Sequence, residues 1–151
     1  MELCSAVSSH LERHDISIPA EDIVVAPGCK QAVLYAMMAT LDPGDEVLLL
    51  APAWPSYDGM LKLLGAVPVH VPVSRENYHP DFTALENSVT SKTKAIMINS
   101  PNNPTGAVYE PKEVEMLVEF AEKHDLWIID DMIYATLVWE EYGYTSQTSV
   151  A

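Results

Sequence analysis

Apolar and polar positions follow two different patterns along the chain. Short apolar runs rich in Val, Ile and Leu alternate with longer segments in which apolar residues recur every three or four positions. The short runs predict strands at residues 23–26, 46–50, 66–73, 95–99 and 126–130. The longer segments predict helices at residues 3–14, 30–41, 57–64, 81–89 and 110–124. Strands that alternate with helices form βαβ units, so we expect an α/β fold of three layers, α/β/α, with a mostly parallel sheet.

Candidate binding residues follow the predicted strands, because ligands bind outside the carboxyl ends of parallel strands. After residues 23–26 the chain turns at Gly28 and enters a helix at Cys29 and Lys30. Backbone N–H groups at a helix start and a lysine side chain suit a phosphate group. An ordinary turn explains the same residues, and neither the GxGxxG nor the Walker spacing occurs.

Three further junctions carry aromatic, amide or acidic side chains. Trp54 follows the strand at 46–50, where its indole can stack on a flat ligand or simply fill the core. Asn103 lies between two prolines that restrict the loop, so its amide can be aimed at a ligand or serve a turn. Asp131 and Tyr134 follow the last strand, where a carboxylate caps the strand or pairs with a cation of a ligand.

Composition limits the class of protein. The 151 residues are 48% hydrophobic and 20% charged, which is typical of one globular domain. Eight basic and 22 acidic residues give a net charge of −14. This charge repels nucleic acids and anionic membranes, so we expect neither as a partner.

The cysteine content predicts a reducing compartment, and the histidine pattern predicts no metal site in the protein. Cys4 and Cys29 are too few for a disulfide framework, and neither a signal peptide nor an apolar run long enough for a membrane span is present. We therefore expect a cytoplasmic protein. His10 and His14 do not form the HExxH pattern, and we interpret them as solvated rather than as metal ligands.

Taken in order, the junctions resemble the pyridoxal-phosphate-dependent aminotransferases of class I/II, the fold-type I family. The similarity is nearest to the aspartate and aromatic amino acid enzymes, and it covers nearly the whole chain. The matching segments are 25–32 (VAPGCKQA), 41–47 (LDPGDEV), 52–57 (PAWPSY), 93–96 (TKAI), 99–109 (NSPNNPTGAVY) and 131–134 (DMIY).

This resemblance implies a role for each candidate toward the cofactor pyridoxal 5'-phosphate. The turn of Gly28, Cys29 and Lys30 holds the phosphate, and Trp54 stacks on the pyridine ring. The remaining three reach the edge of the ring: Asn103 and Tyr134 bind its phenolic oxygen, and Asp131 keeps its nitrogen protonated. Cys29 and Met132 depart from the pattern, because the family often has a small or hydroxylated residue and a Glu there.

The resemblance also implies what residues 1–151 do not contain. We expect them to form part of the large, cofactor-binding domain, without the small domain. No lysine here has the context of the catalytic lysine, and neither Arg13 nor Arg75 matches the arginine that binds the substrate carboxylate. No catalytic residue is therefore assigned within the chain, which we expect to be inactive alone. The complete protein is expected to be a homodimer.

The function implied is amino transfer between an amino acid and a 2-oxo acid. Two alternatives stay open at this point. One keeps the cofactor but changes the reaction, as in the carbon–sulfur β-lyases and the aminocyclopropane-carboxylate synthases, which share these motifs. The other is a truncated, non-catalytic relative that acts as a binding or dimerisation module.

Overall fold

The computed structural model describes residues 2–13 and 16–138. Its centre is a parallel sheet, which in this part of the chain has four strands in the order β2-β1-β3-β4. Because all strands are parallel, their carboxyl ends lie at one edge of the sheet. The strands are β1 (Glu46–Ala51), β2 (Val67–Pro72), β3 (Thr93–Ile98) and β4 (Trp127–Asp130).

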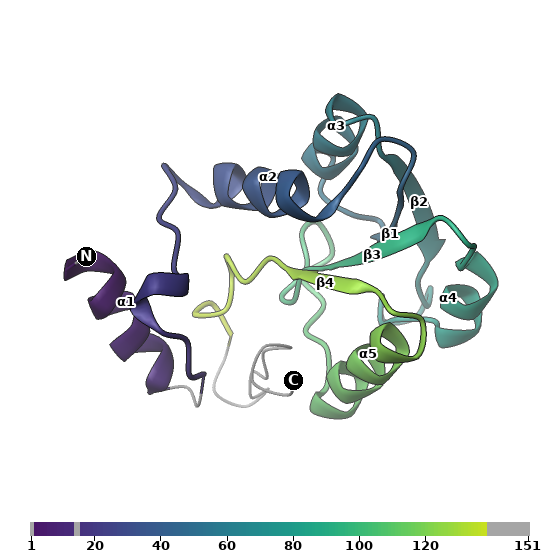
Figure 1. The fold of residues 1–151 in the computed structure, drawn as a ribbon. Helices are drawn as coiled ribbons and strands as arrows, with labels where there is room; N and C mark the ends of the chain where they lie inside the picture. Colours follow the sequence, from purple (N-terminus) through teal and green to yellow (C-terminus); the bar gives the residue numbers. More distant parts are fainter. Residues whose placement is uncertain (1, 14–15, 139–151) are drawn as a thin grey trace.

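Helices cover both faces of this sheet (Figure 1). On one face lie α2 (Cys29–Thr40) and α3 (Ser56–Leu63), and on the other lie α4 (Phe82–Ser88) and α5 (Pro111–Lys123). The predicted three-layer α/β/α arrangement is therefore confirmed. The predicted elements agree with the observed ones to within one or two residues at most ends.

Alternation along the strands divides the core into two halves. Val47 and Leu49 of β1 pack with α2 and α3, whereas Leu48 and Leu50 pack with α4 and α5. Strand β3 repeats the division, with Met97 on the first face. A strand buried on both faces needs apolar residues at successive positions, which is why β1 and β3 read as continuous apolar runs.

Three acidic side chains fix the starts of the two helices on the second face. Asp81 precedes α4, and its carboxylate accepts hydrogen bonds from the backbone N–H groups of Thr83 and Ala84. Glu110 and Glu113 form a reciprocal capping box at the start of α5. These caps satisfy backbone donors that a helix leaves unpaired at its first turn.

The amino-terminal segment lies to one side of the sheet. Helix α1 (Glu2–Glu12) has no buried residue and contacts the 3-10 turn η1 (Ala20–Asp22). Figure 1 shows both elements set apart from the strands, with an extended connection that leads into α2.

The prediction of a strand at residues 23–26 is wrong. This stretch is neither helix nor strand, and the four described strands pair only with one another. Val24 is 78% exposed and Val25 is 52% exposed. A β-branched run becomes a strand only where a neighbour completes its ladder of hydrogen bonds, and the described residues supply no such neighbour here. In residues 2–13 and 16–138, no helix has the length and apolar character needed to cross a bilayer.

We predict that Leu48→Ala strongly destabilises the domain. Leu48 is completely buried between β1 and the second helix layer, so its truncation should lower the free energy of unfolding by about 2–5 kcal/mol. Leu63→Ala is the matched control, because Leu63 is 75% exposed and should cost about 0.5 kcal/mol or less. Urea denaturation measures both values, and equal losses would contradict the assignment of the core.

Candidate functional site

The seven candidate residues line one cavity at the carboxyl edge of the sheet. Its volume is about 310 Å³, within the range of small-molecule sites. The prediction that the four junctions meet is therefore confirmed, whereas their roles toward a cofactor remain predictions. The cavity is lined by Gly28, Cys29, Lys30, Trp54, Asn103, Asp131 and Tyr134, together with Tyr57, Asn99 and Ile133.

The turn before α2 presents hydrogen-bond donors to this cavity. Gly28 has φ +107°, a conformation that side chains with a Cβ disfavour, and it precedes the first residue of α2. Its carbonyl accepts from the N–H groups of Gln31 and Ala32. Within the described residues, the N–H groups of Cys29 and Lys30 have no backbone acceptor, and they lie at the positive end of the helix dipole.

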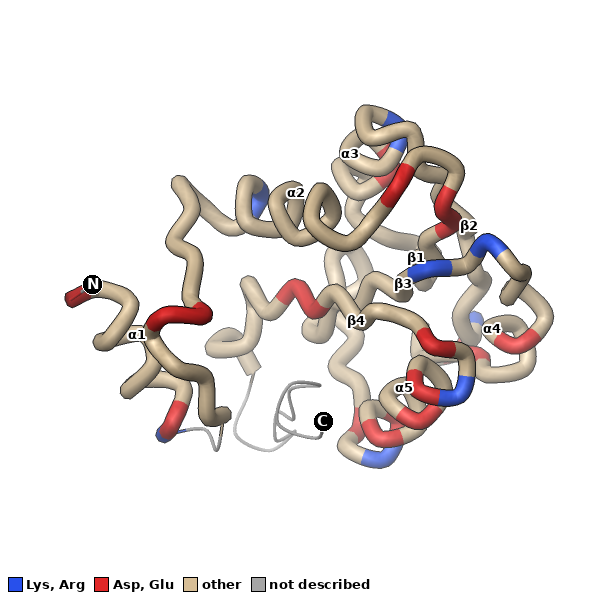
Figure 2. Tube along the Cα trace, in the orientation of Figure 1, with Lys and Arg blue, Asp and Glu red and all other residues tan. Residues whose placement is uncertain are grey.

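Lys30 supplies the positive charge of the cavity. Lys30 is the one basic residue in the α2 sequence. Figure 2 shows acidic positions along much of the rest of the trace, in agreement with the excess of acidic residues in the chain. The Lys30 Nζ lies 5.2 Å from the centroid of the Trp54 ring. The Trp54 ring meets Tyr57 edge to face, with 5.3 Å between the ring centroids. An ammonium group and an indole face thus border the same space.

Asp131 carries the acidic group of the cavity, and it is only 4% exposed. Its Oδ1 accepts hydrogen bonds from the Cys29 thiol at 3.2 Å and from the Ile133 N–H at 3.2 Å. Its Oδ2 accepts from the Tyr57 hydroxyl at 2.7 Å. In the described part of the chain, no Lys, Arg or His lies within ion-pair distance of this carboxylate. A buried anion therefore has only neutral donors.

These contacts suppress ionisation of the two side-chain donors. Burial, and then the neighbouring Asp131 carboxylate, raise the pKa of the Cys29 thiol from 9.0 to about 11. The same two causes raise the pKa of the Tyr57 hydroxyl well above its ordinary value. Both groups stay protonated at neutral pH, so both donate to the carboxylate.

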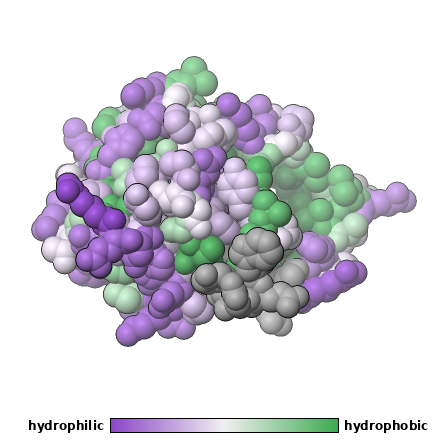
Figure 3. Space-filling model, turned by 180° about the vertical axis from the view of Figure 1, so that it is seen from behind, coloured by the Kyte–Doolittle hydropathy of each residue, from purple (hydrophilic) through white to green (hydrophobic). Residues whose placement is uncertain are grey.

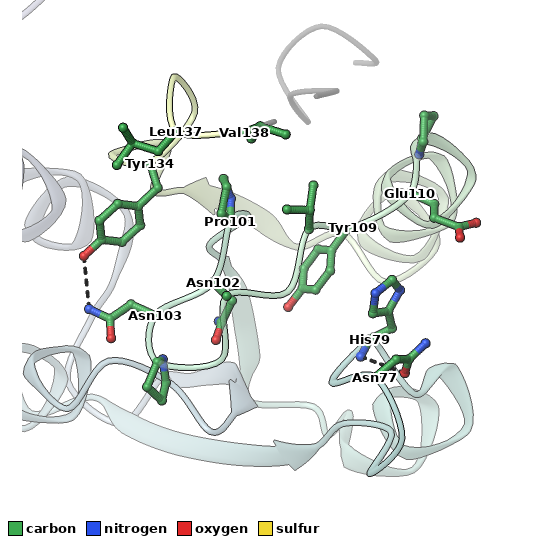
Figure 4. Close-up of a pocket in the computed structure, with 14 residues that line it drawn as sticks. Asn77, His79, Pro101, Asn102, Asn103, Tyr109, Glu110, Tyr134, Leu137 and Val138 are labelled. Carbon is green, nitrogen blue, oxygen red and sulfur yellow. Dashed lines mark hydrogen bonds between the residues drawn. The ribbon is translucent and has the colours of Figure 1, made fainter. Parts of the chain in front are cut away.

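Asn99 connects Asp131 with the loop that carries Asn103. The Asn99 side-chain amide donates to the Asp131 carbonyl at 2.8 Å, and its Oδ1 accepts from the Asn103 N–H at 2.8 Å. The Asn103 amide in turn donates to the Tyr134 hydroxyl at 3.2 Å, as the dashed line in Figure 4 shows. Because Tyr134 accepts there, its own hydroxyl proton is available to another acceptor.

A second, larger cavity lies beyond the Asn103–Tyr134 pair. Its volume is about 1010 Å³, and these two residues line both cavities. Figure 4 shows its other walls, formed by the loop at Pro101 and Asn102 and by the side chains of His79 and Tyr109. The Asn103–Tyr134 hydrogen bond therefore lies at the border between the two spaces.

Metal-binding residues do not gather in the described residues, where no group of three or more His, Cys, Asp or Glu is placed to hold an ion. His14 lies outside the described residues, so the His10–His14 pair is not tested.

Two polar residues of the cavity, Tyr57 and Asn99, were not predicted from the sequence. Tyr57 reads as the first residue of a helix, and only its contact with Asp131 shows its place in the site. Asn99 reads as the end of a strand. A polar residue at the end of a buried strand was the one available signal, because such a side chain needs a hydrogen-bond partner.

Two aminotransferases resemble this chain in sequence over most of its length. The probable aspartate/prephenate aminotransferase of Thermus aquaticus is 42% identical over 149 residues, which are 97% of this chain and 39% of that protein. The aspartate aminotransferase of Thermotoga maritima is 43% identical over 131 residues, 86% of this chain and 35% of that protein. This chain thus spans about two fifths of the length of the relatives it matches.

Solved structures agree with these sequence matches. The aspartate aminotransferase from Thermus thermophilus with maleate superposes with a TM-score of 0.92 at 38% identity, over 99% of this chain and 40% of that one. The aromatic aminotransferase from Pyrococcus horikoshii superposes with a TM-score of 0.95 at 36% identity, over 99% and 41%. The sheet and its helix layers therefore have the fold of these enzymes. The family model for aminotransferase class I and II matches residues 1–150, and this chain belongs to that family.

Proposed function

We propose that this chain forms part of a pyridoxal-phosphate-dependent aminotransferase, which moves an amino group between an amino acid and a 2-oxo acid. The observation that carries the proposal is the buried Asp131 carboxylate, which lines the cavity and, among residues 2–13 and 16–138, has neutral donors alone. The relatives and structures named above are aminotransferases, which favours amino transfer over the lyase reaction. Because the chain spans about two fifths of these proteins, the activity is proposed for the full-length protein.

The proposed phosphate site is the start of α2. The Cys29 and Lys30 N–H groups lie at this helix start, where an anion gains most from the helix dipole, and Lys30 lines the same cavity. Gly28 allows the backbone to make the turn into α2, because a residue with a Cβ would disfavour its positive φ. A cation is also needed here to offset the net charge of −14, which otherwise repels an anionic cofactor.

The proposed ring site lies between Trp54 and the residues that follow the strands. The Trp54 indole offers a flat apolar face. Asn103 and Tyr134 offer an amide and a hydroxyl proton to an oxygen at the ring edge. A ring bound against these residues would meet the Asp131 carboxylate at the floor of the same cavity.

The bound cofactor supplies an electron sink for the pair of electrons left when a substrate loses its α-hydrogen. Asp131 holds a proton at the ring nitrogen, because a buried carboxylate without a cationic partner favours a positive charge beside it. Tyr57 and Cys29 keep this carboxylate in place while leaving its charge intact. We expect residues of the full-length protein outside this chain to supply the lysine that moves the proton and the arginine that binds the substrate carboxylate.

We propose also that the full-length protein is a homodimer, with the amino-terminal segment at the contact. Leu3, Val24 and Val25 are all more than half exposed, and apolar surface of this kind marks an interaction site. Figure 3 shows apolar surface on the side of the molecule that carries this segment.

We predict that Val24→Asp weakens dimer formation, because it places a charge in an apolar contact. Sedimentation of the full-length protein measures the dimer dissociation constant. Leu63→Asp, an exposed position on α3, is the matched control. Equal dissociation constants for the two variants would contradict the proposed contact.

Asp131→Ala is expected to lower the rate of amino transfer by roughly 100-fold or more, because the charge that stabilises the ring proton is lost. Binding of the cofactor phosphate should partly persist, since Gly28, Cys29 and Lys30 are unchanged. The assay measures formation of a 2-oxo product and amination of an added acceptor acid by the full-length protein. Turnover near the wild-type rate would remove the assignment, and release of ammonia in place of transfer would support the lyase.

Lys30→Ala is expected to weaken cofactor binding by about 10- to 100-fold, the range for loss of a hydrogen bond between charged groups. Fluorescence titration of the full-length protein with pyridoxal phosphate measures the dissociation constant. Lys62→Ala is the control, because Lys62 is an exposed lysine of α3 that lies outside the cavity. An unchanged affinity in Lys30→Ala would place the phosphate elsewhere.

A further inference from the structure

We propose that Cys29 is a positioning residue for Asp131. The Cys29 thiol holds the Asp131 carboxylate so that one acceptor position of Oδ2 faces the cofactor ring. This inference rests on the proposed function, because it assigns the ring nitrogen as the group that the carboxylate meets. Cys29 would then have two roles in the site, one for its backbone N–H and one for its side chain. The backbone N–H of this residue faces the proposed phosphate position, and its side chain reaches the acidic group.

The hydrogen bonds of Asp131 identify the open position. A carboxylate accepts at about four positions, two on each oxygen. Oδ1 has two donors, the Cys29 thiol and the Ile133 N–H. Oδ2 has one, the Tyr57 hydroxyl. Among the described residues, the remaining acceptor position therefore belongs to Oδ2.

The Cys29 thiol restrains the rotation of this carboxylate. The Ile133 N–H is a local donor, two residues from Asp131, and moves with the same turn. Cys29 belongs to a different layer, 102 residues away in the chain, and fixes Oδ1 from the start of α2. With Tyr57 of α3 on the other oxygen, two helices determine the plane of the carboxyl group. Loss of the thiol would leave Oδ1 with its local donor alone.

A neutral donor suits this position better than a charged one. The titratable groups that line the cavity with Cys29 are Asp131, Tyr57, Tyr134 and Lys30, and only Lys30 is a cation. The adjacent residue Lys30 directs its ammonium group over Trp54. Because burial and Asp131 raise the pKa of the thiol to about 11, Cys29 stays protonated at neutral pH. It therefore orients the carboxylate and leaves the negative charge for the ring.

The first test measures the thiol itself, in the cofactor-free full-length protein. Iodoacetamide alkylates the thiolate, so the rate of Cys29 modification as a function of pH gives its pKa. We expect modification to follow a pKa of about 11 in the wild type and a lower pKa in Asp131→Asn, which removes the neighbouring charge while the burial of the thiol persists. Peptide mapping separates Cys29 from other cysteines. The same titration in both proteins would overturn the proposal.

The second test measures cofactor binding by fluorescence titration. Cys29→Ala lacks the donor and is expected to raise the dissociation constant for pyridoxal phosphate about tenfold. Cys29→Ser retains a donor and is expected to regain most of the lost affinity. Cys4→Ser is the matched control, because Cys4 lies on α1 and its thiol reaches Ile23 rather than the cavity. Equal affinities of the Ala and Ser variants would overturn the proposal.

The two tests separate failure of this inference from failure of the proposed function. If wild-type protein took up no pyridoxal phosphate, the proposed function and the ring-directed part of the inference would both fall. The thiol titration would still report whether Cys29 is bonded to Asp131. If the wild type bound cofactor and transferred amino groups while Cys29 titrated alike with and without the Asp131 charge, only the positioning role would be lost.

Discussion

The site depends on one hydrogen bond between the ends of two neighbouring parallel strands. Asn99 follows β3 and Asp131 follows β4, and the Asn99 amide donates to the Asp131 carbonyl. The other end of the Asn99 side chain accepts from the Asn103 backbone. One buried amide thus holds two loops in a fixed relation. Such a group is costly to bury unless all its bonds are made, so it specifies one arrangement of the strand ends.

A second constraint comes from charge. Burial of an ionised carboxylate costs free energy that neutral donors offset only in part. Asp131 is buried with a thiol, a phenol and a backbone N–H around it, in a chain that already carries a net charge of −14. Stability alone would be served better by an amide or an apolar residue there. In the proposed function, a cationic ring nitrogen would give this anion a partner, which would link the cost in the fold to the proposed chemistry.

The layers of the fold and most residues of the cavity could be predicted from the sequence for a physical reason. The period of the apolar residues reports burial, and the end of each parallel strand is then known, so Trp54, Asn103 and Asp131 could be placed at one edge. The place of Tyr57 in the cavity could not be predicted, since a tyrosine near a helix start gives no sign of which carboxylate its hydroxyl contacts. The prediction for residues 23–26 was wrong, because an apolar β-branched run shows propensity but not whether a neighbouring strand exists.

We propose above that Asp131 keeps the ring nitrogen of pyridoxal phosphate protonated in the full-length protein. The most direct measurement is the ¹⁵N NMR chemical shift of cofactor labelled at that nitrogen and bound to the protein near neutral pH. We expect the shift of a protonated ring nitrogen in the wild type and of an unprotonated one in Asp131→Asn, with the cofactor bound in both. An unprotonated nitrogen in the wild type, or the same shift in both proteins, would contradict the proposal.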